Sequence, residues 1–385
     1  MRNIAVIGGG AAGIASAIVA ARKGANVTIF EKADRIAKKI LVTGNGRCNL
    51  TNADINPEFY NNPEYVKSIY ERVEAKDVNG FLESVGLLLK ADRDGRVYPV
   101  TEQASTVVNC FLNELKRLNV RIVTGREIKL NKNVDVINGE TFDNVILSVG
   151  NVASTDAKYV NPLESLNVKA TEVYPSLVPL KTDKTFLKGM NGIRVSARLK
   201  LFADSKEVYA EDGEILFRDY GLSGIAVFNA SHYFNLNKNS KTYVSLDLFK
   251  DLTSEDLAAA LIKRSERTPD TEQFFCGLVN KNSAQNISAY LKLGSLIEPS
   301  DIKNIVNVLK DMRFNIISTC AMNMAQVVCG GLKTDEFPNL KSKKYPSLYA
   351  AGEALDVNGL CGGYNLHWAW ASGIYAGAQA VDDTY

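Results

Sequence analysis

The sequence is poor in the residues that most often build metal and redox sites. Its 385 residues include two histidines, two tryptophans and six cysteines, and no two cysteines stand in a C-x-x-C arrangement. None of the cysteine spacings suits zinc or an iron–sulfur cluster, so the sequence predicts no metal site. Free thiols in a reducing cytosol are the simplest interpretation.

An excess of one charge and long apolar runs are also absent. The net charge is +2, with no block rich in lysine or arginine, so we expect no nucleic-acid partner and no binding to an anionic membrane surface. No apolar run is long enough to span a bilayer, and glycines interrupt the stretch from Ile4 to Ala21 that otherwise imitates a signal peptide. We therefore expect a cytoplasmic protein that acts on a small molecule.

The residues that are present predict an α/β fold. Apolar residues make up 46% of the chain, which is enough for a sizeable core in two domains. Asn3 to Ile7 is typical of a buried parallel strand, Gly13 to Lys23 of an alanine-rich helix, and Asn26 to Glu31 of a second strand. This order of strand, helix and strand is typical of a parallel sheet.

Later segments indicate where this sheet is interrupted. Glu102 to Leu118 has the period of a half-buried helix, and Arg121 to Thr124 reads as a strand. Val134 to Val149 predicts a hairpin that turns at Asn138-Gly139 and returns to the central sheet. From about Thr185 to Ser318 alternating segments and then helical ones follow, before the sheet pattern resumes.

We therefore predict a discontinuous Rossmann-type domain, residues 1–184 and 319–385, with an inserted domain at 185–318. Within the insert, a β unit is expected at about 190–250 and a helical piece at about 251–315. No flexible linker separates the parts, so a cleft between insert and host is the natural place for a substrate.

Gly8, Gly10 and Gly13 form G-x-G-x-x-G between the first predicted strand and helix. Gly8 permits a tight turn, Gly10 lets the backbone approach a pyrophosphate, and Gly13 lets helix and strand pack closely. Glu31 follows Gly13 by eighteen residues, where a carboxylate can accept hydrogen bonds from an adenosine ribose. A merely structural glycine turn is the alternative, but the complete unit favours a dinucleotide site.

The C-terminal part of the sequence favours FAD over NAD. Ser347 to Glu353 predicts a short strand that runs into Gly352 and Glu353, whose carboxylate can hold a ribityl chain. Gly362-Gly363-Tyr364-Asn365 then opens a helix that continues from Leu366 to Ala376. Its N-terminus would stabilise the negative charge that reduction places near flavin N1. A glycine-rich turn without a ligand is the alternative.

The loop from Lys38 to Asn52, with the sequence KKILVTGNGRCNLTN, is rich in glycine, amides and positive charge. Such a loop can wrap an anionic cofactor, with Arg47 on a phosphate or on the reduced flavin and Asn49 on the ring edge. A surface turn is the alternative. In all, the residues predicted to contact non-covalent FAD are Gly8, Gly10, Ala11, Ala12, Gly13, Glu31, Lys32, Lys39, Gly46, Arg47, Asn49, Ile128, Gly150, Gly352, Glu353, Gly363, Tyr364, Asn365 and Leu366.

Five motifs in order carry a family resemblance. They are KILVTGNGRCNLTN at Lys39 to Asn52, GRVYPVT at Gly95 to Thr101, PSLVPL at Pro175 to Leu180, GLSG at Gly221 to Gly224, and GEALDVNGLCGGYNLHWAWASG at Gly352 to Gly373. The chain resembles the BaiN-like, aminoacetone-oxidase-type family of FAD-dependent oxidoreductases, within the glutathione-reductase-like flavoprotein group. The resemblance implies a split FAD domain whose insert contains a small β-barrel and a helical subdomain.

The resemblance specifies the cofactor better than the reaction, because the family is associated both with amine oxidation and with reduction of unsaturated steroid intermediates. This chain also departs from the family pattern, with Ser148-Val149-Gly150-Asn151 for the usual Ala-Thr-Gly-Gly, Arg218-Asp219 for Thr-His, and His367 for Gln. We hypothesise hydride transfer between a substrate and flavin N5, with Arg218 and Tyr220 as substrate contacts. His367 is a candidate base, although a lone helical histidine more often serves in packing.

Three functions remain open at this point. The favoured one is reduction of an activated double bond, as in a bile-acid enone. The alternatives are oxidation of a small amine such as aminoacetone with release of hydrogen peroxide, and flavin binding without catalysis. No second G-x-G-x-x-G is present, so electrons would come from NAD(P)H that docks transiently, from another external donor, or from the substrate with oxygen as acceptor.

Overall fold

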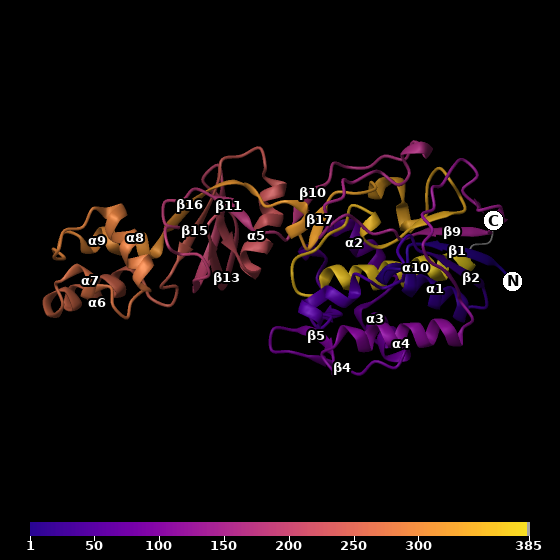
Figure 1. Ribbon diagram of the computed structural model, residues 1–385, viewed down its shortest axis with the longest axis horizontal. Coiled ribbons are helices and arrows are strands. Elements are labelled where there is room, and N and C mark those ends of the chain that lie inside the picture. Colours follow the sequence, from indigo (N-terminus) through magenta and orange to yellow (C-terminus); the bar gives the residue numbers. More distant parts are fainter. Residues whose placement is uncertain (383–385) are drawn as a thin grey trace. The chain divides into compact units, whose positions relative to one another are not determined.

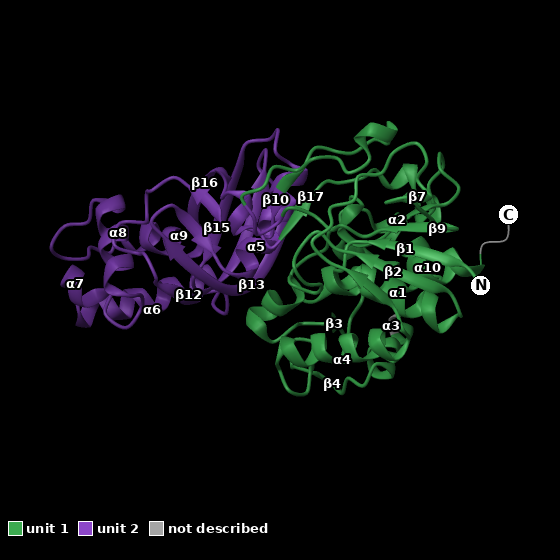
Figure 2. Cartoon of the chain, turned by 45° about the vertical axis from the view of Figure 1, so that its right-hand side comes forward, with its two compact units in different colours: residues 1–152, 156–174, 327–385 green, residues 153–155, 175–326 purple. Residues whose placement is uncertain are grey.

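The computed structural model describes residues 1–382, which form two compact units (Figure 2). Unit 1 comprises Met1–Val152, Asp156–Tyr174 and the chain from Val327 onward, and unit 2 comprises Ala153–Thr155 and Pro175–Gln326. Unit 2 therefore begins before the predicted residue 185 and ends after the predicted residue 318. The reason is strand pairing, because Leu180 pairs with both Leu222 and Thr319 and so belongs to the β structure of unit 2.

The centre of unit 1 is a five-stranded parallel sheet in the order β18-β9-β1-β2-β6. The strands are β1 (Asn3–Ile7), β2 (Asn26–Phe30), β6 (Arg121–Val123), β9 (Asn144–Leu147) and β18 (Leu348–Ala350). Strands β1, β9 and β18 are apolar along most of their length and buried, as expected of strands covered on both faces. The predicted Rossmann-type fold is confirmed, and the sheet is assembled from both ends of the chain.

Helices α1 (Ala11–Arg22) and α10 (Tyr364–Asp382) run side by side against this sheet (Figure 1). Their backbones touch, because a Cβ atom on Gly373 would lie 2.4 Å from the carbonyl oxygen of Ala12, and one on Gly377 would lie 2.5 Å from that of Ser16. Only glycine fits at such distances. The N-terminal and C-terminal parts of the sequence are thus joined helix to helix.

Smaller elements complete unit 1. Strands β3 (Thr51–Asn52), β5 (Arg96–Pro99) and β4 (Leu89–Ala91) form an antiparallel sheet, and helices α2 (Pro63–Tyr70), α3 (Ala75–Ser84) and α4 (Ala104–Arg117) flank the domain. The predicted hairpin turn at Asn138-Gly139 is confirmed between β7 (Val136–Ile137) and β8 (Glu140–Thr141). Its second arm ends at Thr141, and a separate strand, β9, returns to the central sheet. Strand β17 (Val327–Cys329) follows the insert.

Unit 2 contains a closed antiparallel barrel in the order β11-β14-β13-β12-β15-β16. Its strands are β11 (Leu180–Thr182), β12 (Arg194–Ala203), β13 (Lys206–Arg218), β14 (Gly221–Ser223), β15 (Thr242–Asp247) and β16 (Met312–Thr319). The predicted β-barrel is confirmed, but the range 190–250 omits β11 and β16 and includes helix α5 (Ile225–Leu236). Helices α6 (Ser254–Arg267), α7 (Thr271–Phe274), α8 (Lys281–Leu291) and α9 (Ile302–Lys310) form the helical part.

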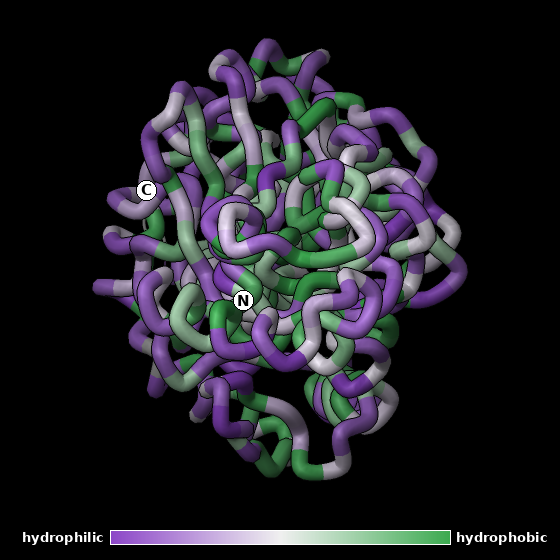
Figure 3. Tube along the Cα trace, turned by 90° about the vertical axis from the view of Figure 1, so that its left-hand side faces the viewer, coloured by the Kyte–Doolittle hydropathy of each residue, from purple (hydrophilic) through white to green (hydrophobic). Residues whose placement is uncertain are grey.

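One hydrophobic core serves both parts of unit 2. Alternate residues of β12, namely Ala197, Leu199 and Leu201, are fully buried, which is the period-two pattern of a strand with one face inside. Ile305 of α9 and Phe314 of β16 belong to the same buried cluster. Figure 3 colours the whole chain by hydropathy, with many of its outer loops hydrophilic. Among residues 1–382, no helix combines the length and apolarity needed to cross a membrane.

Candidate functional site

The predicted cofactor residues follow the carboxyl ends of neighbouring strands of the parallel sheet. Gly8 follows β1, Glu31 follows β2, Gly150 lies just beyond β9, and Gly352 lies just beyond β18. In parallel sheets these ends meet at one edge, and ligands bind outside that edge. The fold therefore gathers residues from positions 8 to 352 into one candidate site.

The glycine turn after β1 is packed too tightly for side chains. A Cβ atom on Gly8 would lie 2.3 Å from the carbonyl oxygen of Ser148, and one on Gly13 would lie 2.0 Å from that of Gly8. The Ser148 hydroxyl also donates to the Gly8 carbonyl at 2.9 Å. The close packing expected at Gly8 and Gly13 is observed. Ser148, which directly follows the neighbouring strand β9, supports this turn, a role that sequence reasoning missed.

The N-terminus of α1 is open. Gly10 precedes the helix, no side chain within residues 1–382 caps it, and its first turn holds no acidic residue. A Cβ atom on Gly10 would meet no atom within 4 Å. The first backbone amide that donates within the helix is that of Ile14, to Gly10, so the preceding amides face outward. Such a terminus is suited to a diphosphate group.

Glu31 is fixed by backbone amides. One carboxylate oxygen accepts from the Gly9 amide and the other from the Ala33 amide, each at 2.8 Å. Each carboxylate oxygen can accept a second hydrogen bond, so both remain able to bind ribose hydroxyls. The carboxylate is therefore held beside the glycine turn in the position predicted for the adenosine half of the cofactor.

Lys39 and Glu353 place opposite charges beyond the ends of β9 and β18. The Lys39 ammonium donates to the Asn151 backbone carbonyl at 2.7 Å and to its side-chain oxygen at 3.3 Å. Burial lowers the pKa of Lys39, and the charge of Glu353 acts in the opposite sense. Burial raises the pKa of Glu353, and the charge of Lys39 opposes this. Lys39 is nevertheless partly accessible to solvent, so its ammonium group is close to protein atoms but is not sealed from water.

The turn that carries Glu353 is held by helix α10. The Gly352 amide donates to the Ser372 hydroxyl at 2.9 Å, and the Trp368 indole donates to the Gly352 carbonyl at 3.1 Å. Gly352 has a φ of +67°, and a Cβ atom there would lie 2.8 Å from the side chain of Ala12. The ribityl position predicted for Glu353 is thus tied to α1 and to α10 at once.

Two glycines bring the chain into the first turn of α10. Gly362 and Gly363 have φ values of +135° and +102°, and a Cβ atom on Gly363 would lie 2.4 Å from the carbonyl oxygen of Thr51. The Tyr364 carbonyl accepts from the Tyr60 hydroxyl at 2.8 Å. The Asn365 side chain accepts from the Gly359 amide at 2.8 Å and donates to the Gly359 carbonyl at 2.9 Å. The Asn365 side chain therefore shapes the loop before the helix, and its predicted contact with FAD stays a prediction.

The loop at residues 38–52 divides its residues between two places. The Arg47 guanidinium lies 4.8 Å from the centre of the Tyr98 ring and 3.7 Å from the Glu102 carboxylate, on the antiparallel sheet. The side-chain oxygen of Asn49 is buried without a hydrogen-bond partner and lies 2.9 Å from the position of a Cβ on Gly363. Asn49 is thus at the start of α10, where the flavin ring edge was predicted. Burial raises the pKa of Cys48 to about 11, which disfavours a reactive thiolate.

The remaining predicted contacts lie around the same edge. Gly46 and Gly150 have φ values of +82° and +65°, and a Cβ on either would meet no atom within 4 Å. Lys32 is exposed, Ile128 is half-buried in the segment after β6, and Leu366 lies in the first turn of α10. These positions leave their roles in FAD binding as predictions.

A half-buried carboxylate that the sequence reasoning missed organises the loop between β18 and α10. One oxygen of Asp356 accepts from the Asn61 side chain at 2.9 Å and the Gly330 amide at 3.0 Å, and the other accepts from the Thr171 hydroxyl at 2.7 Å. Asp356 lies within the motif GEALDVNG, so its position in that motif was the available signal.

The proposed catalytic residues lie in different units. His367 belongs to unit 1 and is fully buried, and burial lowers its pKa to about 3. Arg218 and Tyr220 belong to unit 2 and are half-buried. Burial and the neighbouring Cys320 raise the pKa of Tyr220, which packs beside Val178 and Cys320. The catalytic roles of these residues stay predictions.

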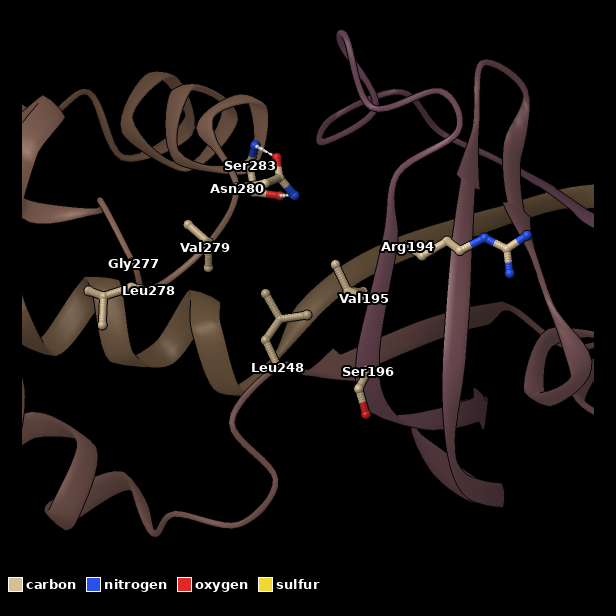
Figure 4. Close-up of a pocket in the computed structure, with 9 residues that line it drawn as sticks. All are labelled: Arg194, Val195, Ser196, Leu248, Gly277, Leu278, Val279, Asn280 and Ser283. Atoms are coloured by element: carbon tan, nitrogen blue, oxygen red, sulfur yellow. Dashed lines mark hydrogen bonds between the residues drawn. The ribbon is translucent and has the colours of Figure 1, made fainter. Parts of the chain in front are cut away.

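A separate cavity of about 390 Å³ lies within unit 2 between the barrel and the helices (Figure 4). The Asn280 and Ser283 side chains there bond to each other at 2.9 Å at the start of α8, and Arg194 pairs with Glu214. The lining residues are Arg194, Val195, Ser196, Leu248, Gly277, Leu278, Val279, Asn280 and Ser283. None of them belongs to the predicted cofactor site.

The residues at the sheet edge fit FAD. An uncapped helix N-terminus suits the diphosphate, a carboxylate fixed beside it suits the adenosine ribose, and a second carboxylate beyond β18 suits the ribityl hydroxyls. At the other end of the edge, the buried Asn49 oxygen without a partner shows that polar hydrogen-bonding capacity is available beside α10.

Known proteins resemble this chain over its whole length. It is 34% identical to the 3-dehydro-bile acid delta(4,6)-reductase of Clostridium scindens, over 99% of this chain and 100% of that protein. It is 26% identical to the ribosomal RNA dihydrouridine synthase of Haemophilus influenzae, over 98% and 97% of the two chains. Among solved structures, the 3-ketosteroid-delta4-(5alpha)-dehydrogenase of Rhodococcus jostii RHA1 aligns with a TM-score of 0.47 at 14% identity, over 98% of this chain and 97% of that one.

The family model described as the HI0933-like protein Rossmann domain matches residues 2–379. The predicted FAD-dependent oxidoreductase of the BaiN-like type is confirmed by this match and by the bile-acid reductase. This chain belongs to the HI0933-like family.

Proposed function

We propose that this chain reduces a carbon–carbon double bond conjugated to a carbonyl group. The observation that carries the proposal is the 34% identity, over the full length of both chains, to a 3-dehydro-bile acid delta(4,6)-reductase. A 3-oxo group next to a Δ4,6 diene is a conjugated enone. The related ribosomal RNA dihydrouridine synthases also saturate a double bond conjugated to a carbonyl, that of uracil.

In this proposal the residues of the sheet edge hold and orient FAD. The amides at the start of α1 bind the diphosphate, Glu31 binds the adenosine ribose, and Glu353 binds the ribityl chain. The first turn of α10 and Asn49 receive the pyrimidine edge of the ring. When bound, FAD supplies the hydride at N5. Arg218 and Tyr220 remain the candidate substrate contacts of unit 2.

A small enone fits the charge of this chain better than a polynucleotide does. The net charge is +2, and the sequence has no block rich in lysine or arginine. Binding of RNA depends largely on contacts between basic side chains and phosphates. We therefore propose a steroid-type enone as the substrate class, with a uridine of ribosomal RNA as the second candidate because two relatives of 26% and 27% identity carry that activity.

The electrons are proposed to come from outside the chain. The sequence contains one G-x-G-x-x-G, at Gly8 to Gly13, and in this proposal that motif binds FAD. NAD(P)H that binds transiently is therefore the proposed donor, in contrast to enzymes with a resident nicotinamide domain.

The test follows the flavin absorbance of the purified protein under anaerobic conditions. We expect NADH or NADPH to bleach the flavin band, and a 3-oxo-Δ4,6 steroid acid to restore it with formation of the saturated product. The corresponding saturated 3-oxo steroid acid is the matched control and leaves the band bleached. In a separate assay in air-saturated buffer, hydrogen peroxide release from aminoacetone, together with no response to the enone, would instead identify an amine oxidase.

The two substrate candidates separate in a second measurement. Reduced protein is incubated with unmodified ribosomal RNA or with the enone, and dihydrouridine and saturated steroid are measured by mass spectrometry. Dihydrouridine without steroid reduction would move the assignment to RNA. If neither substrate reoxidises the flavin, the proposed reaction is wrong while FAD binding stands.

A further inference from the structure

His367 is enclosed in unit 1, and only one of its two imidazole nitrogens has a hydrogen-bond partner among the described residues. The residue is fully buried, and its Nδ1 atom lies 2.6 Å from the Thr51 hydroxyl oxygen. Its Nε2 atom is buried and has no hydrogen-bond partner within residues 1–382. The Tyr70 ring meets the imidazole edge to face, with ring centres 5.2 Å apart. The imidazole therefore contacts the Thr51 segment rather than solvent.

The backbone and the side chain of His367 act on the same junction. Its backbone amide donates to the Gly363 carbonyl at 2.9 Å, while its side chain bonds to Thr51. Between these two points, a Cβ on Gly363 would lie 2.4 Å from the Thr51 carbonyl oxygen. His367 thus holds the first turn of α10 and strand β3 together where their backbones touch.

Two further side-chain bonds join the residue 49–52 segment to the same helix and the turn before it. The Trp370 indole donates to the Leu50 carbonyl at 3.0 Å, and the Asn52 side chain donates to the Gly362 carbonyl at 2.9 Å. Asn49 directly precedes Leu50 in this segment and lies beside Gly363, and its side-chain oxygen has no partner among the described residues. The position of Asn49 relative to the start of α10 therefore depends on the Thr51 contact.

We propose that His367 is a positioning residue that sets how strongly this site prefers reduced over oxidised FAD. It acts through Thr51 by fixing Asn49 and the first turn of α10. This positioning role replaces the role as a base that the sequence suggested for His367. The inference rests on the proposed FAD site and is independent of the substrate. Reduction adds negative charge to the pyrimidine side of the ring, and fixed backbone amides stabilise charge only when they are held in place.

The chemistry of the buried ring agrees with this role. Burial lowers the pKa of His367 to about 3, so the imidazole is neutral at physiological pH. A neutral, enclosed imidazole adds no charge beside the cofactor and serves as a rigid hydrogen-bonding spacer. Glutamine can make one comparable bond to Thr51, whereas leucine fills the space without one.

The experiment compares His367→Leu, His367→Gln and Thr51→Val with the unaltered protein. FAD affinity is measured by fluorescence titration of the apo-protein, and the midpoint potential is measured by dye equilibration. For His367→Leu and Thr51→Val we expect affinity for reduced FAD to fall about tenfold more than affinity for oxidised FAD, which is a potential about 30 mV lower for this two-electron couple. The double variant His367→Leu/Thr51→Val should lower the midpoint potential no further than either single variant. His367→Gln should keep the midpoint potential close to that of the unaltered protein.

His232→Gln is the matched control. His232 is also a buried histidine with a pKa lowered by burial, to about 4, but it belongs to unit 2. Its substitution should leave the potential unchanged, whatever it does to stability. Loss of stability in the His367 and Thr51 variants with an unchanged potential would reduce His367 to a packing residue. If the unaltered apo-protein does not bind FAD at all, the cofactor assignment itself fails before the variants are compared.

Discussion

The two glycine-rich turns of unit 1 solve the same problem by different means. Each lies between a strand of the parallel sheet and a helix whose N-terminus is proposed to bind part of FAD. The turn before α1 is local, because Gly13 packs against Gly8 only five positions away, with Ser148 as its outside support. The turn before α10 is held by distant residues, including Thr51 and Tyr60.

The difference teaches what each helix end is suited for. A diphosphate needs free amides and open space, and the α1 terminus provides both. A planar ring needs a fixed surface with directed polar groups, and the α10 terminus is surrounded by side chains from residues 49–60 that define such a surface. We therefore expect substitutions in the turn before α1 to remove FAD binding. Substitutions in the turn before α10 should instead change the relative affinity for oxidised and reduced FAD.

Gly13→Ala should have the largest effect. A methyl group there would lie 2.0 Å from the Gly8 carbonyl oxygen and 2.6 Å from the Ser148 hydroxyl. We expect the free energy of unfolding to fall by about 3 kcal/mol, the upper range for overpacking, and FAD affinity to fall about 100-fold, equally for oxidised and reduced FAD. Denaturant unfolding of the apo-protein and FAD titration measure both quantities.

Gly80→Ala is the control for that substitution. Gly80 lies within α3, and a Cβ there would meet no atom within 4 Å, so alanine should stabilise the helix by about 0.5 to 1 kcal/mol. Unchanged FAD affinity in Gly13→Ala would mean that the turn can move without cost to the cofactor, and the local account of this site would be wrong.

Gly363→Ala should have the second largest effect. It should also show whether the turn before α10 affects oxidised and reduced FAD differently from the turn before α1. Gly363 has a φ of +102°, and a methyl group would lie 2.4 Å from the Thr51 carbonyl oxygen. We expect a loss of about 2 kcal/mol of unfolding free energy from strain and contact, and a lower midpoint potential because the first turn of α10 is displaced. Equal weakening of oxidised and reduced FAD would show that the two turns do not differ in the way proposed.

Glu353→Gln should have a smaller effect, visible as a pH dependence. Burial raises the pKa of Glu353 above its usual 4.5. A carboxyl whose pKa is raised by folding contributes stability that is fully present below pH 4.5 and is lost as the pH rises through the folded value. The variant has no such loss, so we expect the apo-protein carrying it to gain about 1 kcal/mol relative to the unaltered protein between pH 5 and pH 8.

The measurement is denaturant unfolding across that pH range, with Glu127→Gln as the control because Glu127 is exposed. The difference between the paired curves isolates residue 353 from the other carboxyl groups. A difference that does not change with pH would show that burial of Glu353 in the apo-protein has no consequence for stability.

Local patterns predicted much of this site. Gly8, Gly10, Gly13 and Glu31 were recognisable because a strand, a turn and a helix within thirty-one residues determine their geometry. The barrel was predicted in kind but not in extent, because β11 and β14 have three residues each and become strands only through pairing with distant partners. So short a segment carries no period of its own.

Side-chain partners were the least predictable part. The sequence did not indicate that the Asn365 side-chain amide bonds to the Gly359 backbone. Nor did it indicate that the His367 imidazole lies beside Thr51, which is more than three hundred positions away. Such contacts depend on how α10 packs, and no local pattern records that.

Arg47→Ala should have the smallest effect, and it tests the part of the loop at residues 38–52 that contacts Tyr98. The Arg47 guanidinium lies over the Tyr98 ring and pairs with Glu102 at 3.7 Å. Exposed contacts of this kind contribute about 1 kcal/mol or less to stability. If the side chain stays there when FAD binds, affinity should change less than about threefold, as with the control Arg93→Ala, whose side chain is 95% exposed. A loss above about tenfold, or 1.4 kcal/mol, with Arg93→Ala unaffected, would mean that Arg47 leaves Tyr98 to bind a phosphate. In that case the α1 end of the site would also depend on a residue distant in sequence, and the contrast between the two turns would be one of degree.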